Sequence, residues 1–158
     1  MLTERSPRIA AAHRLLRRSR RTETGEFLAE GAPAVTEAVA YAREHPGEVL
    51  ELFITEAAAA KHVKLVRAAF AAKVEVTQVT EKAAAALSDA ITPQGIVVRC
   101  AHPQTTVADV LAGSPKLVVV LVRANDPGNA GTVIRCSDAA GADKIGRASC
   151  RERVLTDV

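Results

Sequence analysis

The chain has 158 residues, of which 48% are hydrophobic and 25% charged, a composition typical of a globular protein with one domain or two small ones. Aromatic residues make up only 3%, with no Trp and a single Tyr, which disfavours the recognition of bases by stacking on aromatic platforms. The longest apolar run is too short to span a membrane, and no apolar segment of a secretory signal follows the N-terminal arginines, so we expect a cytoplasmic protein.

The cysteines and histidines do not form a pattern typical of a metal site or a disulfide framework. Cys100, Cys136 and Cys150 include no CxxC pair, and three scattered thiols are typical of a reducing compartment. None of the histidines stands at ligand spacing from a cysteine or a carboxylate; they are His13, His45, His62 and His102. We therefore expect no metal site, and we expect these histidines to have surface or core roles.

Positive charge is concentrated at the two ends of the chain. The net charge is +3: residues 1–25 hold seven Arg against two Glu, residues 26–143 ten basic against fourteen acidic side chains, and residues 144–158 four against two. The densest basic run is RLLRRSRR at 14–21. Such a helix suits contact with phosphate groups, and a solvated helix face is the alternative explanation of the same charges.

Helical and strand patterns alternate up to residue 100. Apolar spacing and N-terminal signals, such as Pro33 near a first turn and Thr80 as an N-cap, predict four helices, over 7–20, 32–44, 56–72 and 80–90. Period-two alternation and β-rich composition predict strands at 26–31, 49–55, 73–79 and 94–100. Strands that alternate with helices predict an α/β sandwich with a mostly parallel sheet.

A domain junction is predicted after residue 103. The stretch 101–116 carries two prolines, a short helical pattern at 107–111 and a Gly-Ser-Pro break. We therefore expect a first domain at 1–103, a linker at 104–116 and the start of a second domain at 117–143.

The second domain begins with LVVVLV at 117–122, which does not alternate and therefore predicts a strand covered on both faces in a parallel sheet. The turn RANDPGNAG follows at the carboxyl end of this strand, where ligands of such sheets collect. Pro127 fixes φ, and Gly128 and Gly131 allow close backbone approach. Asn129 is placed to cap a helix over 129–142, whose first N–H groups suit a phosphate.

One arginine interrupts the apolar stretch of this helix. The predicted inward stripe consists of Ala130, Val133, Ile134 and Ser137, so Arg135 points elsewhere and is available to a ligand. The alternative is a surface ion pair between Arg135 and Asp138 at i, i+3. The turn has neither the GxGxxG of dinucleotide folds nor the GK[ST] of a P-loop, so neither cofactor class is supported.

The stretch NDPGNAGTVIRCSDAAGAD at 125–143 closely resembles the first signature motif of the SpoU/TrmH class of RNA ribose 2′-O-methyltransferases, in the SPOUT superfamily. RTETGEFLAEG at 21–31 and ITPQGIVV at 91–98 resemble landmarks of the substrate-binding domain that precedes many of these enzymes. The resemblance covers residues 6–143. It implies an α/β protein in which a ribosomal-protein-like α/β substrate-binding domain precedes the first β-α unit of an incomplete SPOUT trefoil-knot domain.

The resemblance implies methyl transfer from S-adenosylmethionine to a ribose 2′-hydroxyl of tRNA or rRNA. It makes Arg135 and Asn129 the catalytic candidates, and Gly131 the position where the RNA backbone approaches. Because a guanidinium is a poor proton acceptor, we expect Arg135 to orient the phosphate and stabilise alkoxide charge. The candidate RNA contacts are Arg20 and Arg21, with Arg17 and Arg18 behind them. The family usually works as a homodimer, which we expect of the parent protein.

Residues 144–158, KIGRASCRERVLTDV, do not continue the family pattern. They are polar, show no strand alternation and lack the later motifs that hold the methyl donor, so we expect this tail to be foreign to the family. One strand and one helix after residue 116 lie near the lower limit of about 40 residues for an independent core. We expect this half-domain to fold poorly and the polypeptide neither to bind S-adenosylmethionine nor to methylate RNA.

Two other functions remain open at this point. Residues 6–103 alone could form a non-catalytic RNA-binding module that recognises shape and phosphates. A generic α/β protein that binds a ligand only at the strand-to-helix turn is the other alternative. The slope of binding against salt separates these two, because each neutralised phosphate contributes to it.

Overall fold

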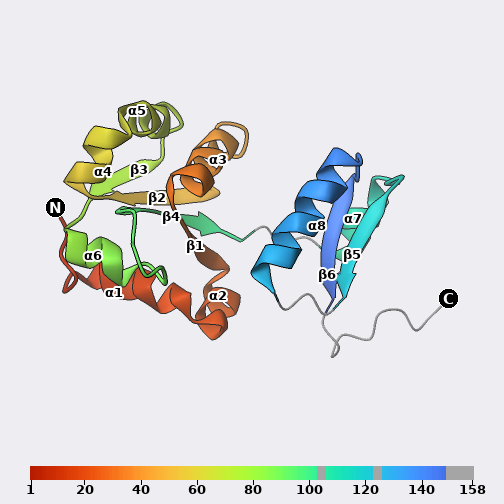
Figure 1. The fold of residues 1–158 in the computed structure, drawn as a ribbon, viewed down its shortest axis with the longest axis horizontal. Helices are drawn as coiled ribbons and strands as arrows, with labels where there is room; N and C mark the ends of the chain where they lie inside the picture. The colour runs from red at the N-terminus through yellow and green to blue at the C-terminus, as the bar shows by residue number, and fades with distance from the viewer. Residues whose placement is uncertain (103–105, 123–125, 149–158) are drawn as a thin grey trace. The chain divides into compact units, whose positions relative to one another are not determined.

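The computed structural model describes residues 1–102, 106–122 and 126–148. The chain divides into two compact units, Met1–Gln104 and Thr105–Val158. The first unit is a four-stranded sheet with helices on both faces, and the second contains a two-stranded sheet with its connecting helix (Figure 1). The α/β class predicted from the alternation of patterns is confirmed.

The sheet of the first unit is mixed rather than mostly parallel. Its strands are β1 (Glu26–Glu30), β2 (Val49–Ile54), β3 (Glu75–Gln78) and β4 (Ile96–Ala101), in the order β1-β4-β2-β3. Only β2 and β3 run parallel, while β4 pairs antiparallel with both β1 and β2. The prediction of a mostly parallel sheet is therefore wrong, because alternating helices and strands do not fix strand direction and β4 inserts in reverse between β1 and β2.

Helices cover both faces of this sheet. They are α1 (Pro7–His13), the 3₁₀ turn η1 (Arg14–Leu16), α2 (Arg18–Thr24), α3 (Ala32–Ala42), α4 (Glu56–Lys61), α5 (Val63–Ala71) and α6 (Glu81–Ala86). Threonine N-caps start two of them: the Thr55 hydroxyl accepts from the Ala58 N–H at 3.3 Å, and the Thr80 hydroxyl from the Ala83 N–H at 3.2 Å. The predicted cap at Thr80 is confirmed.

Two apolar clusters lie on opposite faces of the sheet, as the period-two pattern of the strands requires. In β2, Leu52 and Ile54 pack into the cluster under α3, α4 and α5, whereas Phe53 packs with Ile9 of α1 and with α6. All of these side chains are at most 2% exposed. Figure 1 shows α1 and α6 together on the face away from α3 and α5.

Two predicted helices are broken in the structure. The segment 7–20 bends at Arg17, whose φ of −88° and ψ of 128° are extended, and helix resumes through the polar RTET to Gly25 in the left-handed region. The segment 56–72 breaks at His62 between α4 and α5. Helical spacing is right on either side of each break, but it does not reveal a single residue with a non-helical backbone conformation.

The second unit contains α7 (Val107–Ala112), β5 (Val118–Val122), α8 (Pro127–Ala139) and β6 (Lys144–Ala148). The Thr106 hydroxyl and the Asp109 carboxylate form a capping box that starts α7. β5 and β6 pair in parallel, with Val118 opposite Lys144. The expectation of no strand after residue 143 is therefore wrong, and β5, α8 and β6 form a βαβ unit.

One face of β5 is open in this chain. Val118, Val120 and Val122 are 37, 51 and 64% exposed, because the described helix α8 covers a single face of a two-stranded sheet. The prediction that 117–122 is covered on both faces is wrong for the described residues. The inward stripe of α8 is also only partly buried: Ser137 is 8% exposed, whereas Val133 is 38% and Ile134 49% exposed.

Candidate functional site

The arginine run at 14–21 is folded by the break at Arg17. The break leaves the carbonyls of Leu15 and Leu16 without helical partners, and Nη1 of Arg21 donates to them at 3.0 and 2.8 Å. Leu15 itself is 4% exposed and anchors η1 to the domain. Arg21 therefore holds the break in place.

The break brings Arg14, Arg17 and Arg20 to one hollow of about 450 Å³. The remaining lining residues are Glu4, Ile9, Ala10, His13 and Ala86. We call this feature the arginine hollow. Arg18 is exposed and does not line it. Two of the four arginines expected to contact RNA, Arg17 and Arg20, therefore line the arginine hollow. Arg14 also lines it and was not among the residues predicted from the sequence.

The side chains of the arginine hollow have few competing partners. Arg20 forms an ion pair with Glu23, with Nη1 and Oε2 2.5 Å apart and both side chains partly exposed. Arg14 and Arg17 make no side-chain hydrogen bond or ion pair with any described residue. Nδ1 of His13 lies 2.6 Å from the carbonyl oxygen of Ala86, so it carries the proton and donates it.

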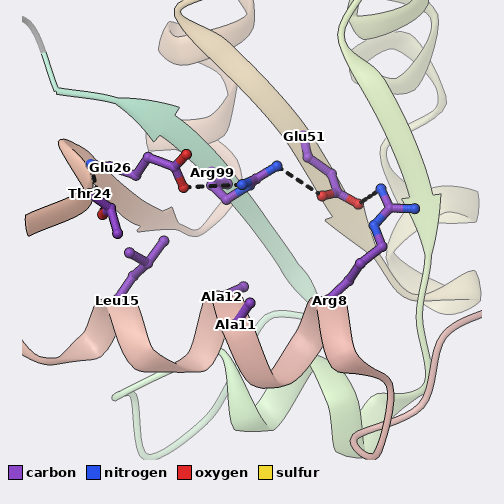
Figure 2. A pocket seen from close by; sticks show the side chains of 8 residues that line it. All are labelled: Arg8, Ala11, Ala12, Leu15, Thr24, Glu26, Glu51 and Arg99. Carbon is purple, nitrogen blue, oxygen red and sulfur yellow. Dashed lines mark hydrogen bonds and ion pairs between the residues drawn. The ribbon is translucent and has the colours of Figure 1, made fainter. Parts of the chain in front are cut away.

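A buried ion-pair cluster lies on the same face of the sheet (Figure 2). Glu51 is 1% exposed, and its carboxylate binds Arg8 of α1, the Thr77 hydroxyl at 2.7 Å and Nη2 of Arg99 at 3.5 Å. Arg99 also reaches Glu26 at 3.0 Å, across the antiparallel pair of β4 and β1. This cluster ties α1 to all four strands of the sheet.

A cavity of about 170 Å³ lies beside these ion pairs, between α1 and the sheet. Nε of Arg99 is buried and has no hydrogen-bond partner among the described residues. A cavity of this size has room for water, which can satisfy that nitrogen. We assign the cluster a structural role. The sequence indicates this cluster through the position of Glu51 in β2: Glu51 lies two residues before Phe53 and therefore points to the same buried face of the sheet.

The predicted turn after β5 is described from Asp126 onward, and Arg123 to Asn125 lie outside the described residues. Asp126 is the N-cap of α8, because its Oδ1 accepts from the Asn129 N–H at 2.7 Å, and Pro127 follows at the first helical position. The prediction that Asn129 caps the helix is wrong: Asn129 stands one turn inside it. Its side chain is exposed.

Arg135 is exposed, and its guanidinium lies back along α8. Nη2 donates to the hydroxyl of Thr132 at 3.2 Å. A Cβ added to Gly131 would stand 3.3 Å from Nη1 of Arg135, so the glycine makes room for the guanidinium. The ion pairs among the described residues do not include one between Arg135 and Asp138, so the alternative surface pair is not formed.

Within residues 1–102, 106–122 and 126–148, no three His, Cys, Asp or Glu side chains gather as metal ligands would. No helix in those ranges is long and apolar enough to cross a membrane.

The fold is an α/β sandwich followed by a parallel βαβ unit, and the arginine hollow on the first unit is a positive surface of the kind that suits the phosphates of a nucleic acid. Residues 6–98 match the model of the MRM3-like substrate binding domain family.

A curated relative supports the same assignment over both units. The chain is 31% identical over 125 residues to the 23S rRNA (guanosine(2553)-2′-O)-methyltransferase RlmP of Bacillus subtilis (strain 168), a match that covers 79% of this chain and 44% of that protein. The chain therefore spans less than half the length of this relative.

Solved structures of similar fold agree. The AdoMet-bound rRNA methyltransferase from Sinorhizobium meliloti matches with a TM-score of 0.67 and 26% identity, covering 91% of this chain and 52% of that one. The SpoU methyltransferase AviRb from Streptomyces viridochromogenes, in complex with AdoMet, matches with a TM-score of 0.65 and 27% identity, covering 90% and 53%. Residues 6–98 belong to the family of MRM3-like substrate binding domains, and the chain is similar over most of its length to SpoU/TrmH methyltransferases.

Proposed function

We propose that this chain is the RNA-docking part, and the first motif-bearing part, of an S-adenosylmethionine-dependent ribose 2′-O-methyltransferase that acts on rRNA. The observation that carries the proposal is the exposed Arg135 beside Gly131 on α8, within a chain that also holds a substrate-binding domain. The relative RlmP is named for a 23S rRNA guanosine, which favours rRNA over tRNA.

Arg135 stabilises the oxygen nucleophile in this proposal. Bound S-adenosylmethionine would supply the methyl group: its sulfonium carbon–sulfur bond would break as the methyl carbon bonds to the ribose 2′-oxygen, the thioether would leave, and the hydroxyl proton would pass to water. Because a guanidinium stays protonated at any working pH, Arg135 donates hydrogen bonds to the phosphate and to the developing oxyanion and does not accept the proton. Its contact with Thr132 holds the side chain along the helix, and Asn129 offers a second polar group one and a half turns earlier.

RNA docking is assigned to the first unit. Arg17, Arg18 and Arg20 offer exposed or partly exposed guanidinium groups on one end of the domain. Arg21, whose Nη1 is engaged by two carbonyls, has other N–H groups left for a phosphate. Gly131 has no side chain, so in this proposal the RNA backbone can come close to α8 beside Arg135.

The methyl donor is not held by this chain alone in the proposal. Its adenosyl group needs an enclosed, largely apolar site, whereas Val120 and Val122 of β5 face solvent in the described residues. The remaining half of the relatives' length supplies that site, and the active parent protein is a homodimer. Residues 144–158 then do not belong to the donor site.

The proposal is tested by two binding measurements on the 158-residue chain. Filter binding of rRNA fragments across a salt series gives a log–log slope, to which each neutralised phosphate contributes about 0.7 to 0.9. We expect a steep slope, and a flat slope refutes RNA docking. Titration calorimetry with S-adenosylmethionine is expected to give no heat of binding, and micromolar affinity contradicts the division of roles. A non-catalytic RNA-binding module gives the same two results but does not support methylation when the missing half is supplied.

A further inference from the structure

The arginine hollow has the size and charge of a site for one segment of a phosphate backbone. Its volume of about 450 Å³ lies within the range of pockets that enclose small organic groups. Three guanidinium groups from Arg14, Arg17 and Arg20 face one carboxylate, that of Glu4, so the lining is strongly positive. Ile9, 1% exposed, and Ala10 form an apolar floor that keeps the hollow open.

The arginines of the hollow are ready to bind an anion. Arg14 and Arg17 are exposed and without side-chain partners among the described residues, so no ion pair has to break before they bind. Arg20 is shared with Glu23, but an ion pair between partly exposed side chains contributes little and exchanges readily. The planar fork of a guanidinium matches two phosphate oxygens at once.

His13 adds a ring nitrogen that can form a hydrogen bond with the ribose. Because Nδ1 donates its proton to the Ala86 carbonyl, Nε2 is the ring nitrogen left to accept a hydrogen bond in the neutral form of the ring, and the described residues supply it with no partner. A ribose 2′-hydroxyl next to the bound phosphate can donate to that nitrogen, whereas deoxyribose cannot. The hollow therefore combines phosphate binding with a contact specific to RNA.

We infer that the arginine hollow binds one ribose-phosphate segment of the RNA, through Arg14, Arg17 and Arg20 on the phosphate and Nε2 of His13 on the 2′-hydroxyl. This inference rests on the proposed function and deepens it, because it selects three arginines and makes Arg21 a positioning residue. Arg21 holds the break at Arg17 through the Leu15 and Leu16 carbonyls, and without the break Arg14 and Arg20 no longer share one hollow. The contacts are with the backbone, so binding does not depend on base sequence.

The experiment measures the anisotropy of a fluorescein-labelled RNA hairpin with an unpaired loop, and of the same-sequence DNA, on addition of the full chain. Arg14→Ala, Arg17→Ala and Arg20→Ala are each expected to weaken RNA binding by about threefold to tenfold at low salt and to lower the salt slope by about 0.7. Arg67→Ala on α5 is the charge-matched control from the opposite face of the sheet and is expected to leave the affinity unchanged. Arg18→Ala is expected to cost less than Arg17→Ala.

A second readout detects the hollow directly. In the wild-type chain, the ring proton resonances of His13, assigned by their loss in His13→Gln, are expected to shift on addition of the RNA hairpin, whereas those of His62 on the opposite face stay in place. If wild-type chain binds RNA with a steep salt slope but the three hollow variants behave like Arg67→Ala, the hollow is wrong and the proposed function stands. If wild-type chain binds no RNA, both are overturned.

Discussion

Replacing Gly95 by alanine tests why the ITPQGIVV stretch has a glycine before β4. Gly95 has a φ of +70°, and a Cβ built there would lie 2.6 Å from Oγ1 of Thr55. Thr55 is 2% exposed, caps α4 through its hydroxyl and donates its own N–H to the Gly95 carbonyl at 2.9 Å. The new methyl group therefore strains the backbone and also displaces a helix cap.

The size of the effect follows from four contributions. A left-handed conformation costs an alanine about 1 to 2 kcal/mol, and the smaller entropy of the unfolded chain returns about 0.4 to 1 kcal/mol. Displacing the Thr55 cap adds about 1 kcal/mol, and forcing extra volume into a packed site adds about 1 to 3 kcal/mol. We expect Gly95→Ala to lower the free energy of unfolding by about 2 to 5 kcal/mol.

A matched control separates the contact from the backbone strain. Gly47 has a φ of +91°, and a Cβ there would meet nothing within 4 Å, so Gly47→Ala carries backbone strain alone. Urea unfolding followed by circular dichroism gives both free energies, and Gly95→Ala is expected to cost at least about 1 kcal/mol more. In a double-mutant cycle, Thr55→Ala should relieve part of the Gly95→Ala loss. Equal losses at Gly95 and Gly47, with no coupling to Thr55, would refute this reasoning.

Three further predictions concern other parts of the chain. Glu51→Ala removes the buried carboxylate that Arg8, Thr77 and Arg99 share and leaves Arg99 paired with Glu26 alone. We expect it to destabilise the first unit by about 2 kcal/mol in urea unfolding, with Glu51→Gln losing less; no change on Glu51→Ala contradicts the role of the ion-pair cluster. Burial raises the pKa of the Cys100 thiol to about 11, so only about one Cys100 thiol in a thousand is ionised at pH 8. Cys100 should therefore react with Ellman's reagent far more slowly than the exposed Cys136 until the chain is unfolded. Hydrogen bonds from the backbone N–H groups of Leu117 and Lys116 lower the pKa of Asp143. The stabilisation by the Asp143 carboxylate is therefore complete above the unfolded pKa of about 3.9 and is lost as pH falls through the lower folded pKa. Acid unfolding curves should show this loss in the wild-type chain and not in Asp143→Asn.

Local patterns in the sequence predicted most elements but not how they are assembled. Period two placed Leu52 and Phe53 on opposite faces of β2, and a threonine before a helical pattern located the cap at Thr80, because both signals act within a few residues. Strand direction depends on contacts between segments distant in sequence, so the reversed insertion of β4 was not predictable from alternation. The pairing of β6 with β5 is likewise a contact between distant segments. In addition, the five residues of β6 show no alternation of apolar and polar side chains that would indicate a strand.

The candidate site was predictable in part. The apolar stripe of α8 indicated that Arg135 points away from it, and the side chain is exposed in the structure. Residue type does not identify the cap of α8, because Asp126 and Asn129 are both good capping residues and only the backbone conformation decides between them. The arginine hollow depends on one extended residue, Arg17, which no spacing rule locates.

The central claim is that this chain supplies both RNA docking and the arginine of a 2′-O-methyltransferase. The most direct measurement joins residues 1–143 to the C-terminal half of the Bacillus subtilis relative and follows transfer of tritiated methyl from S-adenosylmethionine to rRNA. We expect no incorporation by the 158-residue chain, incorporation at ribose 2′-oxygens by the chimera, and a loss of about 10²-fold to 10³-fold in Arg135→Lys. A chimera that binds the donor and RNA but methylates equally well with Arg135→Lys contradicts the claim.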